Sequence, residues 1–316
     1  MPALMLPPLL QRRLDAAALA LLYPPGAPEA DFTQPRGEQA LVPPDSVSWR
    51  IFKNPVSLFV GGVAAVILEL AEPRVRTGVW EHSSFRSDPV KRLQRTGMAA
   101  MITVYGARSV SEKMIAGVVR LHDKVRGETP SGDSYRANDV ELLTWVQATA
   151  SFGFAEAYNR YVRPLGADER NRAYAEAGPA ARLYGATQAP SSEAELQALF
   201  DAMRARLEPS PILFEFLKIM RTARVFPAPL QPLQRLLVGA AVEMTPDWAR
   251  RRLGLMPSHG LRSWERAVVR AAGGLADKIV LRTSPAVQSC LRLGLPEDYL
   301  YGVPPRERSA DAQNRR

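Results

Sequence analysis

Hydrophobic and polar positions follow a helical period along most of the chain. The clearest case is the run VSLFVGGVAAVILELA, which follows Asn54-Pro55 and is apolar nearly all round. Asparagine is a favoured N-cap and proline a favoured first helical residue, so this pair predicts a helix start. A helix that is apolar on every side is expected to lie buried at the centre. Gly61-Gly62 within it would permit the close approach of another helix, the commoner case, or of a flat ligand.

Two more helices are predicted directly after this central helix. Asp88-Pro89 is a second pair of N-cap and first helical residue, and its helix is expected to cover 89–105 and to stop at Gly106. Residues Ser109–Glu112 have the spacing of a capping box. We therefore expect the next helix to start there and to end at Gly127.

The remaining chain carries similar helix signals and no strand signal. Asn138 or Asp139 is expected to cap a long helix that Pro164 closes. No stretch alternates as a half-buried strand would, and no internal repeat is present. The fold class predicted from these patterns is all-α. The other predicted helices cover residues 9–22, 167–177, 191–206, 211–222, 230–243, 246–253, 262–279 and 284–292.

The pattern predicts a single helical domain over residues 46–300. An N-terminal helix and an irregular arm rich in Pro and Gly are expected over 1–45, and a flexible tail over 301–316. Arg12-Arg13 followed by LDAAALALLY faintly resembles a twin-arginine signal, but Asp15 interrupts the apolar run. A cytoplasmic protein with an amphipathic first helix is therefore predicted, and export is the weaker alternative.

Composition and charge narrow the classes of function. The chain has 41 Lys+Arg and 32 Asp+Glu, which gives a net charge of +9, but the basic residues are scattered. Nucleic-acid binding requires clustered charge and is not predicted. The longest charge-free apolar run, Pro55–Leu68, is too short to span a bilayer comfortably. No transmembrane segment is expected, whereas peripheral membrane contact and the oligomeric state stay open.

Few residues of the chain could bind a transition metal. Cys290 is the only cysteine, so an intramolecular disulfide is impossible and a reducing compartment is indicated. The only histidines are His82, His122 and His259, and their spacing fits no zinc motif. His122 shares an apolar helical stripe with Val118. On spacing alone, a hydrogen-bonded core histidine is the commoner case and a metal ligand the rarer one.

The helix predicted over 89–105 carries a polar patch near its start. Arg92, Arg95 and Thr96 are spaced to cover one side of the helix. A solvated basic face is the commoner interpretation of such spacing. If the face instead continues inward, the arginines could clamp an anionic group, because guanidinium stays protonated and donates several hydrogen bonds.

Several blocks of the chain together resemble one family. In order they are LELAEPRVRTGVWEHSSFRSDPVKRLQRT, VVRLHDKVRG and LLTWVQATASFGFAEAYNRYVRPL. They resemble the catalytic domain shared by bacterial rubber oxygenases and the chain-cleaving oxygenase of mycophenolic acid biosynthesis. The resemblance covers roughly residues 46–185 and, more loosely, the helices that follow. It implies a helical fold with a globin-like core around haem b and oxygenase chemistry that uses dioxygen as cosubstrate.

The resemblance also implies roles for individual residues. His122 matches the proximal haem ligand and would be the metal-binding residue. Arg92, Arg95 and Thr96 match the family's R-x-x-[KR]-T pattern on the distal side. A lysine at the second of these positions can coordinate iron in rubber oxygenases, but Arg95 is not expected to do so. His82 lies in a further matching block, EHSSF, where a structural role is also open.

The sequence departs from the family at two positions. Many relatives have histidine where this chain has Glu72, and histidine where it has Gln147. Gln147 can form hydrogen bonds with a cofactor or substrate but cannot carry a proton at neutral pH. One hypothesis is that Glu72 pairs with Arg92 or Arg95 and sets the distal polarity. A solvated carboxylate at a helix end, paired with Arg74 or Arg76, is an equally good alternative.

The function expected from the resemblance is a haem b-dependent oxygenase that acts with dioxygen on an apolar substrate such as an isoprenoid, lipid or polyketide chain. Two alternatives remain. One is a non-catalytic haem protein for storage, sensing or transfer. The other is a helical interaction protein that has lost haem. Residues 186–300 could form a substrate lid or complete the core, and their composition favours neither.

Overall fold

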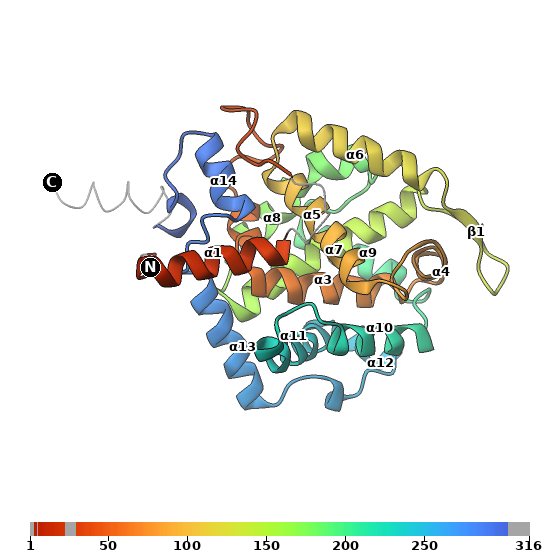
Figure 1. The fold of residues 1–316 in the computed structure, drawn as a ribbon. Coiled ribbons are helices and arrows are strands. Elements are labelled where there is room, and N and C mark those ends of the chain that lie inside the picture. Colours follow the sequence, from red (N-terminus) through yellow and green to blue (C-terminus); the bar gives the residue numbers. More distant parts are fainter. Residues whose placement is uncertain (1–2, 5, 23–29, 303–316) are drawn as a thin grey trace.

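A computed structural model describes residues 3–4, 6–22 and 30–302, which form helices apart from one small hairpin (Figure 1). The all-α fold class is thereby confirmed, whereas a globin-like arrangement stays a prediction. The α-helices are α1 (Pro8–Leu22), α2 (Val47–Phe52), α3 (Pro55–Glu69), α4 (Pro73–His82), α5 (Pro89–Tyr105), α6 (Arg108–His122), α7 (Val140–Tyr161), α8 (Ala167–Tyr184), α9 (Glu193–Met203), α10 (Pro211–Thr222), α11 (Gln231–Met244), α12 (Asp247–Arg252), α13 (Ser263–Ala276) and α14 (Pro285–Arg292). The short elements are β1 (Arg126–Glu128), β2 (Ser134–Arg136) and the 3-10 turns η1 (Ala228–Leu230), η2 (Pro257–His259) and η3 (Tyr299–Tyr301).

The predicted central helix, α3, packs most extensively against α7. Its start is capped as expected, because the Asn54 side chain accepts hydrogen bonds from the backbone N–H groups of Val56 and Ser57. Gly61 and Gly153 allow the two helices to cross with their backbones almost touching. A Cβ at Gly61 would lie 2.7 Å from the Gly153 carbonyl oxygen, and a Cβ at Gly153 would lie 2.3 Å from that of Gly61. Close helix packing, the commoner of the two interpretations, therefore holds for Gly61.

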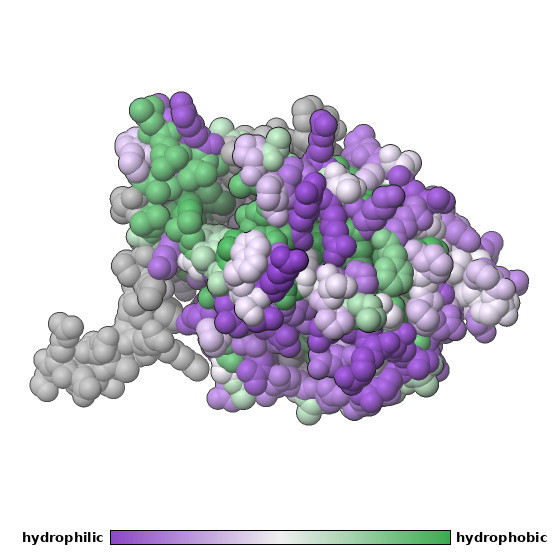
Figure 2. All heavy atoms as spheres, turned by 90° about the horizontal axis from the view of Figure 1, so that it is seen from below, coloured by the Kyte–Doolittle hydropathy of each residue, from purple (hydrophilic) through white to green (hydrophobic). Residues whose placement is uncertain are grey.

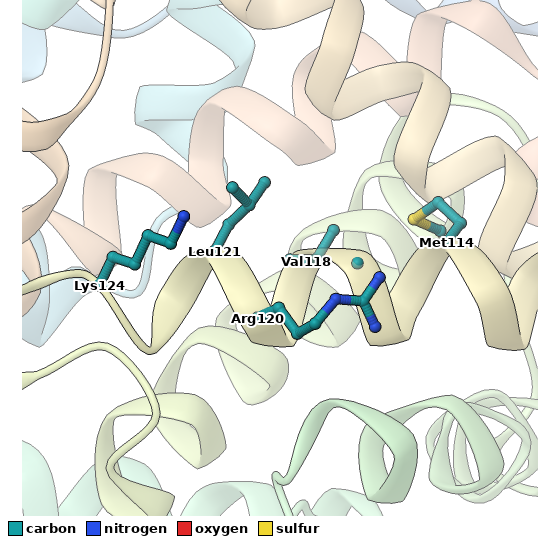
Figure 3. A pocket seen from close by; sticks show the side chains of 6 residues that line it. Met114, Val118, Arg120, Leu121 and Lys124 are labelled. Atoms are coloured by element: carbon teal, nitrogen blue, oxygen red, sulfur yellow. The ribbon is translucent and has the colours of Figure 1, made fainter.

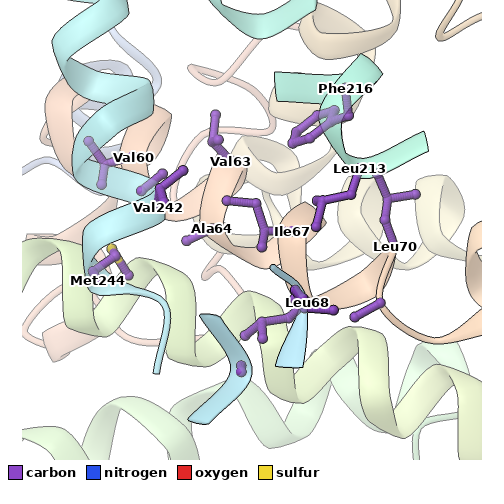
Figure 4. Packing of buried hydrophobic residues seen from close by; sticks show 14 of the residues in the cluster. Val60, Val63, Ala64, Ile67, Leu68, Leu70, Leu213, Phe216, Val242 and Met244 are labelled. Atoms are coloured by element: carbon purple, nitrogen blue, oxygen red, sulfur yellow. The ribbon is translucent and has the colours of Figure 1, made fainter. Parts of the chain in front are cut away.

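The largest hydrophobic cluster surrounds α3 (Figure 4). The helix buries Val60, Ile67 and Leu68 completely, and Figure 4 shows α10 and α11 supplying further apolar side chains around them. Phe216 from α10 is also completely buried. Each such side chain removed from water contributes roughly 1.5–3 kcal/mol. α3 is therefore the scaffold on which the remaining helices are placed.

A second layer is built from α5 and α6, which lie above α3 in Figure 1. α5 packs against α2, α6 and α14, while α6 packs against α5 and α8, and neither has an extensive contact with α3 or α7. The Tyr105 hydroxyl donates to the backbone oxygen of Trp49 at 2.7 Å, which fixes the end of α5 to α2. The two layers are thus tied together at their edges rather than along their length.

The predicted capping box at the start of α6 is wrong. The N-cap is Ala107, and the backbone N–H of Ser109 donates to Glu38, a residue far away in the chain, at 2.6 Å. A tertiary contact thus supplies the acceptor that Glu112 was expected to provide. The helix also ends at His122, five residues earlier than predicted, because Gly127 belongs to β1.

Three elements were missed by the sequence patterns: α2, α4 and the hairpin of β1 and β2. The expectation that no strand occurs is wrong at the hairpin, whose antiparallel register pairs Arg126 with Arg136. Each strand has only three residues, too few for an alternating pattern to be recognised. Tyr135 is buried and lies 3.3 Å from the position of a Cβ on Gly78 of α4, which docks the hairpin on that helix.

Both ends of the chain include residues outside the description. The predicted flexible tail lies almost entirely within residues 303–316, and part of the predicted irregular arm lies within 23–29, so these expectations are not tested. Residues 30–46 contain no helix or strand, as predicted for the arm. Among the described helices, none is by itself long and apolar enough to cross a membrane; α3 and α4 together have the length and composition but are bent by 113°.

Candidate functional site

Four helices bring polar groups together on the interior side of α3. Glu69 is the last residue of α3, Arg92 lies in the first turn of α5, and His122 is the last residue of α6. The positive charge of Arg92 influences both Glu69 and His122, so it lies near each of them. Thr149 of α7 adds a hydroxyl beside Glu69. The centre therefore holds a carboxyl, a guanidinium and an imidazole.

Glu69 has the most perturbed carboxyl of the centre. Burial raises its pKa to about 7, and the charge of Arg92 and the hydroxyl of Thr149 oppose this shift only partly. The side chain nevertheless keeps some accessible surface. Because its pKa is about 7, the carboxyl is protonated in about half of the molecules at neutral pH.

His122 is half-buried, and its Nδ1 atom is completely buried without a hydrogen-bond partner. The nearby Asn138 amide favours the protonated ring, yet its Oδ1 also lacks a partner, so the two side chains do not form a well-aligned hydrogen bond. Burial is the main cause that lowers the pKa of His122, and the charge of Arg92 lowers it further. The imidazole is therefore neutral at physiological pH.

The three residues predicted to form one patch on α5 do lie together, but they differ in depth. Arg92 is half-buried, and burial lowers its pKa while Glu69 raises it. Arg95 and Thr96 are exposed. The Thr96 hydroxyl donates to the backbone oxygen of Arg92 at 2.9 Å, a bond within the helix. Of the three, only Arg92 thus reaches the interior.

Incompletely buried side chains form a stripe along α3. Beyond its first residue, this helix keeps accessible surface only at positions that share one face: Leu58, Phe59, Gly62, Val66 and Glu69. A similar stripe on α7 consists of Gln147, Ala150, Ser151 and Phe154. The two stripes meet where the ring of Phe154 lies 3.9 Å from the position of a Cβ on Gly62. Mostly apolar walls therefore extend from Glu69 along the interior face of both helices.

An open hollow of about 580 Å³ runs along α6, and none of the residues of the centre lines it (Figure 3). Figure 3 shows Met114, Val118 and Leu121 projecting from the same side of the helix. Arg120 and Lys124 add two cations to the lining. Val118 also lies one turn before His122, so the hollow borders the histidine's face of the helix. The hollow is a surface groove, since Leu121 in its lining is 61% exposed.

Glu72 does not pair with Arg92 or Arg95, so that hypothesis is wrong. Its carboxylate is buried, caps α4 by accepting from the backbone N–H of Val75 at 2.8 Å, and forms an ion pair with Arg74 at 2.8 Å. Of the alternative, the pairing with Arg74 at a helix end holds, but the expectation of a solvated carboxylate is wrong, because Glu72 is buried. The carboxyl near Arg92 belongs to Glu69, one helical turn earlier.

The other predicted residues lie at different distances from the centre. Gln147 is half-buried on the accessible stripe of α7, where its Nε2 donates to the Ser151 hydroxyl at 3.2 Å. His82 is exposed, and its Nε2 lies 3.2 Å from the Tyr135 hydroxyl, which helps to hold the hairpin on α4. Cys290 is buried with its pKa raised by burial to about 12, so its thiol is protonated.

Sequence reasoning missed Glu69, Asn138 and Thr149 as members of the centre. The only available signal was a carboxylate at the C-terminal end of an apolar helix, where the helix dipole disfavours negative charge. Within the described residues, no group of three or more His, Cys, Asp or Glu side chains is arranged to hold a metal ion. A haem iron requires no such group, because the porphyrin supplies four of its ligands.

Comparison with known proteins identifies the family. Searches of curated proteins and of solved structures find no match. The model of the family described as ER-bound oxygenase mpaB/B'/rubber oxygenase, catalytic domain, matches residues 49–276. The match begins in α2, ends with α13 and includes every residue of the centre. The chain therefore belongs to the mpaB and rubber oxygenase catalytic domain family, as the sequence resemblance predicted.

Proposed function

We propose that this protein is a haem b-dependent oxygenase that acts with dioxygen on an apolar substrate. Membership of an oxygenase family supports the reaction class. The observation that carries the haem assignment is His122, a neutral imidazole whose buried Nδ1 has no partner. Buried ring nitrogens normally find one, and an orphaned nitrogen at the border of an apolar hollow is typical of a functional site.

The residues of the centre fit a haem group. Iron requires a neutral imidazole, which His122 supplies. A porphyrin face requires apolar walls, which the stripe of α3 and the hollow on α6 provide. Propionates require cations, and Arg92 on one side or Arg120 and Lys124 on the other could bind them. We assign these roles to a haem domain over residues 46–300.

When bound, haem would supply the activation of dioxygen. The chain supplies position, charge and the exclusion of water. Arg92 stays protonated at all relevant pH values and donates hydrogen bonds from the inner end of the α5 patch. Glu69, with a pKa of about 7, can hold or release a proton at its carboxyl near neutral pH. Val66 and Phe154 keep the adjoining walls apolar, which suits an isoprenoid, lipid or polyketide-like chain.

A non-catalytic haem protein is the second candidate. Gln147 lies on the interior stripe and cannot carry the proton that a histidine could carry there. This candidate binds haem in the same place but consumes no dioxygen with any substrate. A helical interaction protein without haem is the third. For all three candidates we propose a cytoplasmic location. This proposal rests on the presence of a single cysteine, which is buried and forms no disulfide.

The visible spectrum of protein from haem-supplemented cells tests the assignment. We expect a Soret band that His122→Ala removes and that His82→Ala, the exposed histidine matched as a control, leaves unchanged. Carbon monoxide added after dithionite should shift the band if the bound haem can accept a further ligand. A wild-type protein that stays colourless and also fails to bind added haemin would overturn the proposal. Haem binding without dioxygen uptake over a panel of apolar substrates would favour the second candidate.

A further inference from the structure

The solvent face of α13 is apolar, which is unusual for a helix on the surface of a protein. Trp264, Val268 and Leu275 are 59%, 41% and 53% exposed, respectively. Their spacing places them on one side of the helix, and the exposed Ala267 and Ala271 lie between them. The usual surface helix turns its apolar stripe toward the core and its polar side chains toward water. Here the outward side has the apolar stripe as well.

The inward side of α13 shows why the helix cannot simply rotate to bury this stripe. Val269 is completely buried, and Gly273 sits directly on α7. A Cβ at Gly273 would lie 2.2 Å from the backbone oxygen of Tyr161, so no other residue fits at this contact. The close contact fixes the helix orientation. The exposure of Trp264 is therefore a property of the fold.

Apolar surface continues from α13 onto the N-terminal segment. The backbone N–H of Leu4 donates to the backbone oxygen of Lys278 at 2.9 Å, just beyond the end of α13. Leu4, Leu9 and Leu10 are 42%, 77% and 46% exposed. Figure 2 shows a hydrophobic area on the side of the molecule where the start of α1 lies in Figure 1. We call Leu4, Leu9, Leu10, Trp264, Val268 and Leu275 the apolar face.

The border of the apolar face is cationic. Arg12, Arg13, Arg262 and Arg270 are exposed, and Lys278 follows α13. The nearby carboxylates are engaged within the protein: Asp277 forms an ion pair with Lys53 at 2.8 Å, Glu265 accepts from the backbone N–H of Arg262 at 2.7 Å, and Asp15 accepts from that of Arg282 at 2.8 Å. The five cations named therefore exceed the three carboxylates, of which Asp277 is already paired with Lys53, so the border has a net positive charge.

We propose that the apolar face docks on the surface of an anionic lipid bilayer. An exposed tryptophan and leucines bordered by arginines are the combination that places a helix in the interface between lipid headgroups and chains. The cations would meet anionic headgroups, each strengthening attachment. A second copy of the chain fits less well, because pairing two identical faces would bring their cationic borders together.

This inference does not depend on haem. α13 packs against α3, α7 and α11, whereas the hollow next to His122 lies along α6 on the opposite side of Figure 1. The two proposals can therefore fail separately. If both hold, an apolar substrate dissolved in a bilayer would reach an enzyme that is already attached to that bilayer.

Vesicle flotation with the full chain tests the proposal. The probes are vesicles of phosphatidylcholine alone and of phosphatidylcholine mixed with phosphatidylglycerol. We expect binding to the mixed vesicles at low salt, and a loss of at least about tenfold in the triple variant Trp264→Ser, Val268→Ser, Leu275→Ser. The matched control is Leu183→Ser, Leu230→Ser, Met256→Ser, whose side chains are 41%, 47% and 60% exposed elsewhere on the surface. It should bind as the wild type does.

A second measurement tests the charged border and the orientation. Arg12→Gln with Arg13→Gln should weaken binding to the mixed vesicles by about fivefold for each charge removed, with less change on phosphatidylcholine alone. Brominated lipids should quench Trp264, the tryptophan that is largely exposed in the described chain. Absence of wild-type binding, or an equal loss in both triple variants, would overturn the proposal. A second outcome would also overturn it: sedimentation shows a dimer for the wild type and a monomer for the Trp264 triple variant, and neither protein binds vesicles.

Discussion

The two layers of helices that enclose the candidate site are packed in opposite ways. α3 and α7 cross with their backbones in contact at Gly61 and Gly153, and Val60, Ala64 and Ala65 of α3 are buried next to that crossing. α5 and α6 stand off from α3, and the facing residues keep accessible surface even where Glu69 is deep enough for a strongly raised pKa. One layer is thus a rigid scaffold, and the space beside it carries polar groups that the fold itself does not require.

Residues of the close crossing therefore stabilise the fold, whereas residues of the polar centre are available for function. Only glycine fits at the close crossing, and the contact between the two backbones holds α3 and α7 in place. The open side costs stability, because Glu69 and His122 are desolvated without full compensation by partners. Buried polar groups that lower the stability of the fold are typical of functional sites. Three substitutions, ordered by expected effect, test whether the division is real.

The largest effect is expected at the crossing. Gly153→Ala would place a methyl group 2.3 Å from the Gly61 carbonyl oxygen, which forces α3 and α7 apart. We expect a loss of about 3 kcal/mol or more in the free energy of unfolding, measured by urea denaturation. Gly97→Ala in α5 is the control, since a Cβ there meets nothing within 4 Å. It should instead gain about 0.5–1 kcal/mol from helix propensity.

Equal stability of the two alanine variants would contradict the comparison. It would mean that the crossing relaxes without cost and that α3 and α7 do not form a rigid wall. A loss confined to Gly153→Ala would separate the crossing from a general intolerance of alanine in the buried helices.

The second effect concerns Glu69 and depends on pH. The folded state raises its pKa from 4.5 to about 7, so the folded protein holds this proton more tightly than the unfolded chain does. The stability associated with the protonated form is fully present below pH 4.5 and is lost as the pH rises through 7. Glu69→Gln removes this loss, so we expect it to unfold like the wild type near pH 4.5. At pH 8 it should be more stable by up to about 3 kcal/mol.

Thermal and urea unfolding of the haem-free protein from pH 4.5 to pH 8 would measure this difference. Glu72→Gln is the control, because its carboxylate is engaged by Arg74 and by a backbone N–H group. A Glu69→Gln variant with an unchanged pH dependence would show that the carboxyl is ordinary, and the interior centre would lose its acid–base member.

Much of the scaffold could be predicted from local signals, and the site only in part. Asn54-Pro55 and Asp88-Pro89 predicted the starts of α3 and α5 because caps act within four residues. The capping box at Ser109 failed because Glu38 from the distant arm takes its place. The 113° bend between α3 and α4 separates Glu69, which lies near Arg92, from Glu72, which caps α4, and no local pattern encodes that angle. His122 and Arg92 were found through the resemblance rather than through spacing.

The smallest effect is expected at Glu72, where the sequence suggested a functional role and the structure shows a helix cap. Glu72→Gln weakens the cap of α4 and one ion pair, but Arg74 keeps Glu141 as a partner at 2.9 Å. We expect a loss of about 1 kcal/mol in the free energy of unfolding. The absorption spectrum of any bound haem should stay as in the wild type, whereas Glu69→Gln should change it. A spectral change in Glu72→Gln with none in Glu69→Gln would reverse the assignment of the two carboxyls and place the polar centre at the start of α4.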